Sequence, residues 1–376
     1  MTTPRLAELT TIRLGGPAAQ YVGAQTEAEL IAAVRAADDA GEPLLVIGGG
    51  SNLVVGDEGF PGTVVRDLRS EVVVEGDIGV CAGASVRVPA GTPWEDVVDR
   101  CVAEGWVGVE ALTGIPGSTG ATPVQNVGAY GQEVAGVVST VRVWDREQAR
   151  VRTLAVGELA FGYRTSLLKR SLRTEGPDVG PSRWAPTPRY VVLEVGFQLR
   201  LGQLSAPIAY PELAALLDVP VGNRAPLTEV RDAVRRLRAR KGMLLDDADP
   251  DTWSAGSFFT NPVLPVELAD TLPDGAPRYP VRSALPESTT GPSLGAVDPS
   301  LVKTSAAWLI EHAGFGKGFG LPGPVSLSTK HTLALTNRGA GTTADLLALA
   351  RQVRDGVRDR FGVTLEPEPV LVGASL

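Results

Sequence analysis

Three consecutive glycines follow an apolar run and have the chemistry of a backbone anion site. Residues 44–57 read LLVIGGGSNLVVGD, so an expected buried strand leads into the glycines at 48–50, then Ser51 and Asn52. Without Cβ atoms, successive N–H groups can turn toward one ligand. The segment lacks the lysine of a P-loop, and Leu53 stands where the Rossmann pattern has its third glycine. A tight strand-to-strand turn is the alternative.

A second loop combines glycines with small hydroxyl and amide side chains. Residues 114–133 read GIPGSTGATPVQNVGAYGQE. Such a chain can wrap a polar, ring-containing ligand through main-chain hydrogen bonds. Long loops without regular structure are uncommon inside compact domains and are often functional. A surface loop without function is the alternative.

Helix caps mark two elements that would position these loops. Thr26, with Glu29 three residues later, predicts a capping box for a helix that stops at Gly41. The sequence TPWE at 92–95 predicts another capping box, with proline at the first helical position, for a helix to about Glu104.

Hydrophobic patterning predicts further elements toward the C-terminus. Strands are expected at 137–145 and 190–201, and a strand-like segment at 365–373. Apolar residues at helical spacing predict an amphipathic helix over 342–362, with Gly362 as its cap. The low-complexity stretch from Leu272 to about Ser300 is expected to be loop.

Composition excludes several classes of protein. The chain has 376 residues, which favours two or three lobes. No apolar stretch reaches the roughly 18 residues of a membrane helix, and no secretory signal is recognisable. A net charge of −8 disfavours nucleic acid as a partner. Two cysteines cannot form a disulfide framework, so a reduced cytoplasm is expected. No cluster has metal-ligand spacing, so no catalytic metal is expected.

Six ordered segments together resemble the UDP-N-acetylenolpyruvoylglucosamine reductase (MurB) family. They are the two glycine loops and YRTSLLK, SAGSFFTNPV, KTSAAWLIEHAG and LEPEPVLVG, and they span nearly all of the chain. The resemblance implies an α+β fold, with a two-lobed FAD-binding region of the vanillyl-alcohol-oxidase/PCMH type and an α+β substrate-binding domain. The domains implied are residues 1–70 with the strand 364–376, residues 71–205, and residues 206–363.

The resemblance also implies a reaction. NADPH reduces noncovalently bound FAD, which then reduces UDP-N-acetylglucosamine enolpyruvate to UDP-N-acetylmuramate in peptidoglycan precursor synthesis. Covalent flavin attachment is not expected, because His312 and His331 are the only histidines and neither lies in a glycine loop. The expected partners are NADPH and the enolpyruvyl sugar nucleotide, without nucleic acid or membrane insertion. The expected protein is a cytoplasmic monomer.

Three residues match the catalytic positions of the family. Arg164 would grip the substrate carboxylate, since a guanidinium can form two parallel hydrogen bonds to it. Ser257 would donate the proton, which requires a strongly basic enolate in a dry site. Glu368 would polarise the intermediate or share the proton network. Glu366 lies two residues away and would face the same way on a strand, so spacing alone does not separate the two, and the match to the end of the segment favours Glu368. The proline at 369 departs from the family pattern and removes a backbone donor.

The resemblance assigns further residues to ligands. Tyr210 places the chain in the subclass with a tyrosine loop over the substrate, Lys241 matches a lysine near the diphosphate, and Asn261 lies near the uridine end. The neighbouring arginines of the segment 228–242 are interpreted mostly as a solvated helix face. The residues assigned to FAD are Ile47, Gly48, Gly49, Gly50, Ser51, Asn52, Gly114, Pro116, Gly117, Ser118, Gly120, Ala121, Gln125, Asn126, Gly128, Ala129 and Tyr130.

Two other functions are compatible with the fold. One is a different FAD-dependent oxidase or dehydrogenase of the same superfamily. The other is a nucleotide-binding or cell-wall regulatory protein that has kept the fold and lost the chemistry. The presence of AGSFFTN and of the terminal glutamate segment favours the reductase over the oxidase, and the presence of Arg164, Ser257 and Glu368 favours it over the regulatory protein.

Overall fold

The computed structural model describes residues 3–75, 83–174, 180–282 and 296–376. The chain divides into two compact units, each described here by itself. The first unit comprises Met1–Ala18, Gly50–Phe60 and Leu245–Leu376, and the second comprises Ala19–Gly49 and Pro61–Leu244. The three functional domains expected from the sequence stay a prediction.

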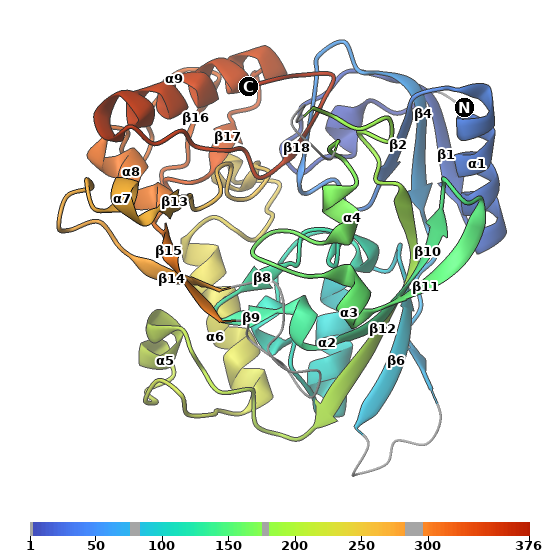
Figure 1. Ribbon diagram of the computed structural model, residues 1–376, viewed down its shortest axis with the longest axis horizontal. Helices are drawn as coiled ribbons and strands as arrows, with labels where there is room; N and C mark the ends of the chain where they lie inside the picture. Colours follow the sequence, from blue (N-terminus) through green and yellow to red (C-terminus); the bar gives the residue numbers. More distant parts are fainter. Residues whose placement is uncertain (1–2, 76–82, 175–179, 283–295) are drawn as a thin grey trace. The chain divides into compact units, whose positions relative to one another are not determined.

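The second unit begins with a small sheet covered by one helix (Figure 1). Its strands follow the order β1-β4-β2, and β2 and β4 run parallel. Thr26 caps the helix by accepting a hydrogen bond from Glu29, and Gly41 ends it with φ of +64°, so this predicted helix is confirmed. The elements are β1 (Ala18–Ala24), α1 (Glu27–Ala40), β2 (Leu44–Ile47) and β4 (Phe60–Asp67).

A larger antiparallel sheet forms the centre of the second unit. The strand order is β11-β10-β12-β6-β5, and β7 pairs with the far end of β12. Helix α2 buries Trp94 and Val98 against this sheet, where the Trp94 ring centroid lies 6.0 Å from that of Phe197. Both strands predicted over 137–145 and 190–201 are confirmed. The elements are β5 (Val73–Val74), β6 (Ala84–Pro89), α2 (Trp94–Glu104), β7 (Trp106–Val107), β10 (Val138–Asp145), β11 (Arg150–Ala155) and β12 (Tyr190–Leu201).

The predicted capping box at the start of α2 is wrong, although the helix itself is present. Pro93 is the N-cap and makes no side-chain cap. The Thr92 hydroxyl instead donates to the Glu71 carbonyl and accepts from the Glu71 N–H, each at 3.1 Å. The Glu95 carboxylate accepts from Thr113 and from the N–H of Gly114. The side chains of Thr92 and Glu95 therefore bond to residues distant in sequence, and neither caps α2.

Short elements complete the second unit. Helices α5 and α6 pack together through Leu213, Val230 and Val234. The remaining elements are η2 (Glu110–Leu112), η3 (Thr119–Ala121), β8 (Gly128–Ala129), β9 (Gln132–Glu133), η4 (Val134–Gly136), α3 (Val156–Leu159), α4 (Leu167–Arg170), α5 (Pro211–Leu216) and α6 (Leu227–Arg240).

The first unit gathers both ends of the chain. Strand β18 runs parallel to β3, which directly follows the first glycine loop. A three-stranded sheet has the order β13-β15-β14, and β16 pairs with β17. The elements are η1 (Leu6–Glu8), β3 (Leu53–Val55), η5 (Pro250–Thr252), β13 (Val263–Pro265), α7 (Val266–Ala269), β14 (Tyr279–Arg282), β15 (Val297–Lys303), α8 (Ala306–His312), β16 (Val325–Leu327), β17 (Leu335–Asn337), α9 (Thr343–Phe361) and β18 (Val370–Val372).

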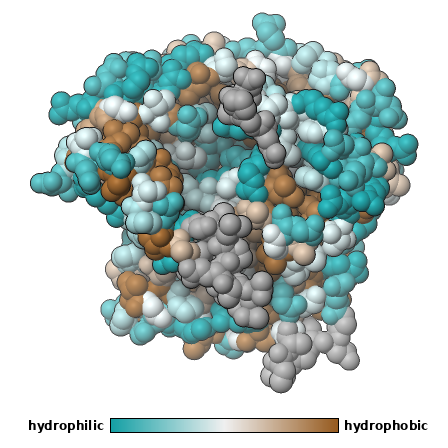
Figure 2. Space-filling view, in the orientation of Figure 1, coloured by the Kyte–Doolittle hydropathy of each residue, from teal (hydrophilic) through white to brown (hydrophobic). Residues whose placement is uncertain are grey.

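The long predicted amphipathic helix is confirmed as α9. Leu346, Ala350, Val353 and Val357 are buried along one face, and Gly362 ends the helix with φ of +68°. The outward face is hydrophilic and forms the teal surface at the top left of Figure 2. The helix therefore packs its apolar face into the hydrophobic core of the first unit.

The expectation of a loop between Leu272 and Ser300 is wrong in part. Strand β14 and the beginning of β15 lie within it, with Val281 paired to Asp298 and Arg282 to Val297. These strands are held by pairing with each other, which local composition does not reveal. The rest of the segment, 283–295, lies outside the described residues.

Over the part of the chain that the structure describes, no helix is both long and apolar enough to cross a membrane.

The start of α9 yields a stability prediction. Asp57 accepts hydrogen bonds from the N–H groups of Thr343 at 2.7 Å and Ala344 at 3.0 Å, so Asp57→Ala leaves two helix-terminal donors without their acceptor. We expect a loss of about 1–2 kcal/mol in the free energy of unfolding, measured by denaturant titration. Glu58→Ala removes the adjacent exposed carboxylate as a control. An equal loss in both variants would contradict the capping role.

Candidate active site

The two glycine loops contact each other in the second unit. A Cβ atom on Gly49 would lie 2.7 Å from Gly117 Cα, and one on Gly48 would collide with the Ser118 hydroxyl. The first two glycines of the run are therefore required by the neighbouring loop. The sequence had suggested only that they make room for a ligand.

The third glycine of the run, Gly50, lies against the backbone of Leu9 and not against the second glycine loop. Gly50 has φ of +63°, and a Cβ there would collide with the carbonyl oxygen of Leu9 in the first unit. The N–H of Thr11 donates to the Gly50 carbonyl at 3.2 Å. Each glycine of the run thus allows a separate close approach of main chain.

Backbone donors remain available where the two loops meet. Among the described residues, the N–H groups of Gly48, Gly49, Gly117 and Ser118 donate no hydrogen bond to another residue. Neighbouring main-chain N–H groups without a protein acceptor can bind an anion. Their availability is compatible with the phosphate groups of a dinucleotide cofactor.

The second loop is held in place by its own polar groups. Asn126 is 1% exposed, and its amide group donates to Glu133 at 2.8 Å and to the Gly162 carbonyl at 3.1 Å. The Asn126 amide oxygen accepts from the N–H of Ala135 at 3.2 Å. The side chain therefore fixes the loop, and its predicted contact with FAD stays a prediction.

Arg164 lies in a tight turn directed at the second loop. Gly162 and Thr165 exchange backbone hydrogen bonds across this turn at 3.1 and 3.3 Å. The half-buried guanidinium donates from Nη2 to the Gly128 carbonyl at 2.9 Å. The turn thus fixes the predicted carboxylate-binding cation against the loop assigned to the cofactor.

Three predicted site residues other than glycine have left-handed backbones. The φ angles are +49° at Asn126, +50° at Tyr130 and +52° at Arg164. Such conformations cost free energy and persist where the surroundings enforce them, often at functional sites. All three lie in the second unit, in or against the second glycine loop, although other non-glycine residues such as Ala149 and Ala160 share this conformation.

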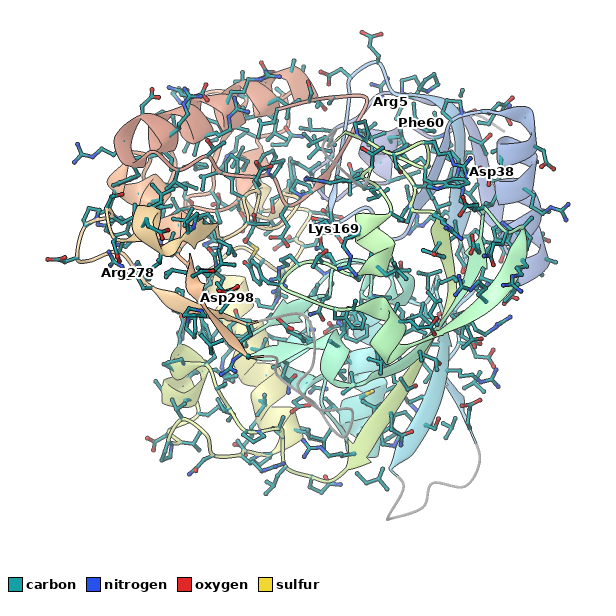
Figure 3. All side chains as sticks on the ribbon, viewed as in Figure 1. Arg5, Asp38, Phe60, Lys169, Arg278 and Asp298 are labelled. Atoms are coloured by element: carbon teal, nitrogen blue, oxygen red, sulfur yellow. The ribbon has the colours of Figure 1, made fainter. Side chains whose placement is uncertain are left out.

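Lys169 is a further cation near this loop that received no role from the sequence. Its Nζ donates to the Gln125 side chain at 3.4 Å, from the helix α4 (Figure 3). Ser166 caps α4 and donates to the Val124 carbonyl at 2.6 Å. The segment YRTSLLK therefore anchors the loop as well as supplying Arg164.

The structure brings the serine and glutamate segments together in the first unit. The N–H of Glu368 donates to the Phe258 carbonyl at 2.8 Å, and the N–H of Thr260 donates to the Glu366 carbonyl at 3.0 Å. Glu366 is exposed, whereas Glu368 and Ser257 are both half-buried. The difference in exposure favours Glu368 over its neighbour as the site carboxylate.

The proline at 369 fits this pairing. The N–H groups that pair are those of Glu368, toward Phe258, and of Val370, toward the Asn52 carbonyl at 2.9 Å. Proline falls at the position between them, where neither of these hydrogen bonds needs a donor. The departure from the family pattern therefore leaves the placement of Glu368 intact.

Tyr130, Tyr210 and Lys241 form one cluster in the second unit. The two tyrosine rings meet edge to face with centroids 5.2 Å apart. Lys241 Nζ lies 5.8 Å from the Tyr130 centroid, 5.9 Å from the Tyr210 centroid and 2.6 Å from a carboxylate oxygen of Glu212. Burial raises the pKa of Tyr130, against the opposing effect of Lys241.

Asn261 lies in the first unit and has a structural partner. Its side-chain oxygen accepts from the N–H of Ala306 at the start of α8, at 2.9 Å. Asn261 belongs to the serine segment, so this bond links that segment to α8. Its contact with the uridine end of a substrate stays a prediction.

Most of the basic helix presents its arginines to solvent, as expected, and Arg238 is an exception. Arg236 and Arg240 are exposed. Arg238 reaches Gly114 and donates from Nη2 to the Met243 carbonyl at 2.9 Å, and its Nε is buried without a hydrogen-bond partner among the described residues. Burial lowers the pKa of Arg238.

The contact between the two loops yields a second prediction. Gly49→Ala places a Cβ against Gly117, so one loop must shift. We expect a lower melting temperature and FAD binding weakened about tenfold, measured by fluorescence titration of the apoprotein. Gly157→Ala is the matched control, because a Cβ there has no atom within 4 Å. Unchanged FAD affinity in Gly49→Ala would contradict this assignment.

Comparison with known proteins supports one family across the whole chain. Family models match at residues 18–154, for an FAD binding domain, and at 249–372, for the C-terminal domain of UDP-N-acetylenolpyruvoylglucosamine reductase. The reductase of that name from Thermobifida fusca is 54% identical over 99% of this chain and 97% of its own, and that from Nocardia farcinica is 53% identical over 99% and 89%. The crystal structure of the Thermus caldophilus reductase (MurB) has a similar fold, with a TM-score of 0.61 at 23% identity over 98% of this chain and 97% of its own. The chain belongs to the UDP-N-acetylenolpyruvoylglucosamine reductase family.

Proposed function

We propose that this chain reduces UDP-N-acetylglucosamine enolpyruvate to UDP-N-acetylmuramate in peptidoglycan precursor synthesis, with FAD as cofactor and NADPH as electron donor. The observation that carries the proposal is the 54% identity, over nearly the full length of both chains, to a reductase named for this substrate. The matching FAD-binding family model and the backbone donors of the glycine loops support the cofactor.

The residues that would hold FAD are those of the two glycine loops. The available N–H groups of Gly48, Gly49, Gly117 and Ser118 suit the pyrophosphate, since main-chain nests bind anions. Bound FAD supplies hydride transfer from NADPH to the enolpyruvyl carbon. The chain's own residues bind the substrate, orient it and control the proton.

Arg164 is the proposed partner of the substrate carboxylate. Addition of hydride to the terminal carbon leaves negative charge on the adjacent carbon and the carboxylate as an enolate. A guanidinium already fixed in place stabilises that charge without reorganisation. The strained turn at Arg164 and its hydrogen bond to Gly128 supply this fixation.

Ser257 is the proposed proton donor to the enolate. Among the described residues its hydroxyl makes no hydrogen bond, so it is free to donate to a ligand. The flanking Phe258 and Phe259 are each 1% exposed and hold the segment in the core. Glu368 is hydrogen-bonded through its backbone to this segment, and we assign its carboxylate to polarising the intermediate or sharing the proton network.

Two finer properties belong to the proposal. We infer a cytoplasmic location, because the nucleotide-linked substrate and NADPH are metabolites of that compartment. We also infer a monomer, which light scattering of the purified protein would test.

One cuvette experiment tests the function. The purified flavoprotein is kept without oxygen and its visible spectrum is followed on adding NADPH and then UDP-N-acetylglucosamine enolpyruvate. We expect the flavin bands to bleach with NADPH and to return with the enolpyruvyl sugar. Reoxidation by oxygen but not by the sugar would instead support the oxidase alternative.

Ser257→Ala separates the two half-reactions. Flavin reduction by NADPH should stay near the native rate, because it needs no proton from Ser257. Reoxidation by the enolpyruvyl sugar should slow by about 100-fold or more, since a general acid commonly contributes about 10² to 10⁴. Both rates are measured by stopped-flow absorbance, with the reductive half-reaction as the internal control. An equal loss in both would indicate a structural role.

A further inference from the structure

Lys241 is already paired with an internal anion. Its Nζ lies 2.6 Å from Glu212, which sits in the first turn of α5, while Lys241 follows the last turn of α6. Both side chains are partly exposed, the lysine by 30% and the glutamate by 48%, so an incoming solute can reach the pair. The Glu212 carboxylate thus lies next to the Lys241 ammonium, where an oxyanion of a ligand could bind instead.

The surroundings of the pair suit a phosphate group. Lys241 Nζ lies about equally far from the rings of Tyr130 and Tyr210. Arg238, one helical turn earlier on α6, acts electrostatically on Tyr130. Lys241 therefore brings one cation and two nearby phenol rings to the position of Glu212, and Arg238 adds positive charge on the side of Tyr130.

The electrostatic state of Lys241 reflects this pairing. Burial by itself lowers the pKa of Lys241, but the hydrogen bond to Glu212 and the nearby tyrosines leave it raised. The ammonium is therefore charged and preorganised before any ligand arrives. A phosphate that binds to Lys241 must compete with Glu212 or accept its like charge as a neighbour.

We propose that Glu212 is a resident counter-ion of Lys241 that the diphosphate of an incoming nucleotide displaces. Glu212 thereby weakens nucleotide binding and speeds nucleotide release. The inference rests on the proposed function, and specifically on the contact between Lys241 and the diphosphate. Each turnover would require two nucleotides to leave, NADP⁺ and UDP-N-acetylmuramate, so a site that binds both diphosphates too tightly would slow the cycle.

Removal of the counter-ion is the test. Glu212→Gln keeps the size of the side chain and removes its charge. The affinities of the holoenzyme for NADP⁺ and for UDP-N-acetylmuramate are measured by calorimetry, and the dissociation rates by stopped flow. We expect both dissociation constants to fall about three- to fivefold in low salt, the scale of an exposed ion pair. The gain should shrink in about 0.3 M salt, where exposed charges are screened.

A structural role predicts the opposite direction. If Glu212 only holds α5 against α6, then Glu212→Gln should lower the melting temperature and weaken or leave unchanged the binding of both nucleotides. Either result for binding would overturn the proposal. Glu212→Asp keeps the charge on a shorter side chain and should retain most of the native affinity.

Glu229→Gln is the matched control for net charge. Glu229 is an exposed glutamate in the first turn of α6, the end of the helix away from Lys241, and has no ion pair among the described residues. Its substitution removes the same charge from the same unit. An affinity gain equal to that of Glu212→Gln would mean that only net charge matters, and the proposal would fail.

Lys241→Ala separates this inference from the proposed function. If it leaves nucleotide binding unchanged, the proposed contact with the diphosphate fails and the inference fails with it. If it weakens binding while Glu212→Gln brings no gain, only the counter-ion inference fails. If both the diphosphate contact and the counter-ion role are correct, the Lys241→Ala/Glu212→Gln double variant should bind nucleotides like Lys241→Ala alone. In that variant the residue at 212 has no lysine to neutralise.

Discussion

The absence of Cβ atoms where the two glycine loops meet is the constraint on which the rest of the site depends. Gly49 approaches Gly117 so closely that any side chain would push the loops apart. This approach is also what leaves adjacent N–H groups of both loops available beside each other. A side chain at Gly48 or Gly49 would therefore do more than fill a ligand's volume. It would move apart the two sets of N–H groups that we propose bind the pyrophosphate.

Three residues in or against the second glycine loop also have strained backbones. Asn126, Tyr130 and Arg164 adopt left-handed backbones that cost free energy, and each must be enforced by its neighbours. For Asn126 the enforcement is a side-chain amide satisfied on both sides, and for Arg164 it is a turn closed by two hydrogen bonds. A guanidinium held in this way loses little further freedom when it binds a carboxylate. In the proposed function, this fixed guanidinium is preorganised to stabilise the charge of the enolate.

The sequence correctly predicted the helices and strands that are determined by residues close to each other in the chain. The cap at Thr26, the apolar spacing of α9 and the hydrophobic patterning of β10 and β12 each depend on neighbours within a few residues, and all three sets of elements are present. Long-range contacts account for the errors and for the exception among the arginines of α6. Thr92 bonds to Glu71 instead of capping α2, β14 exists only through its pairing with β15, and Arg238 is buried by its approach to Gly114. The resemblance to a family located Ser257 and Glu368, but only the structure shows that their segments are hydrogen-bonded to each other.

In the first unit, the serine segment is connected to the cofactor loop by a short series of hydrogen bonds. Asn52 follows the glycine run, accepts from Val370 through its carbonyl, and donates from its side chain to the Glu368 carbonyl at 3.4 Å. Glu368 in turn donates to the Phe258 carbonyl, next to Ser257. The backbone that carries the proposed carboxylate is thus held on one side by the loop assigned to FAD and on the other by the segment of the proposed proton donor. Proline at 369 is tolerated because these bonds use the donors on either side of it. A displacement of Asn52 would therefore also shift the segment of the proposed proton donor, so we expect the proposed cofactor loop and the proposed proton donor to be coupled through this unit.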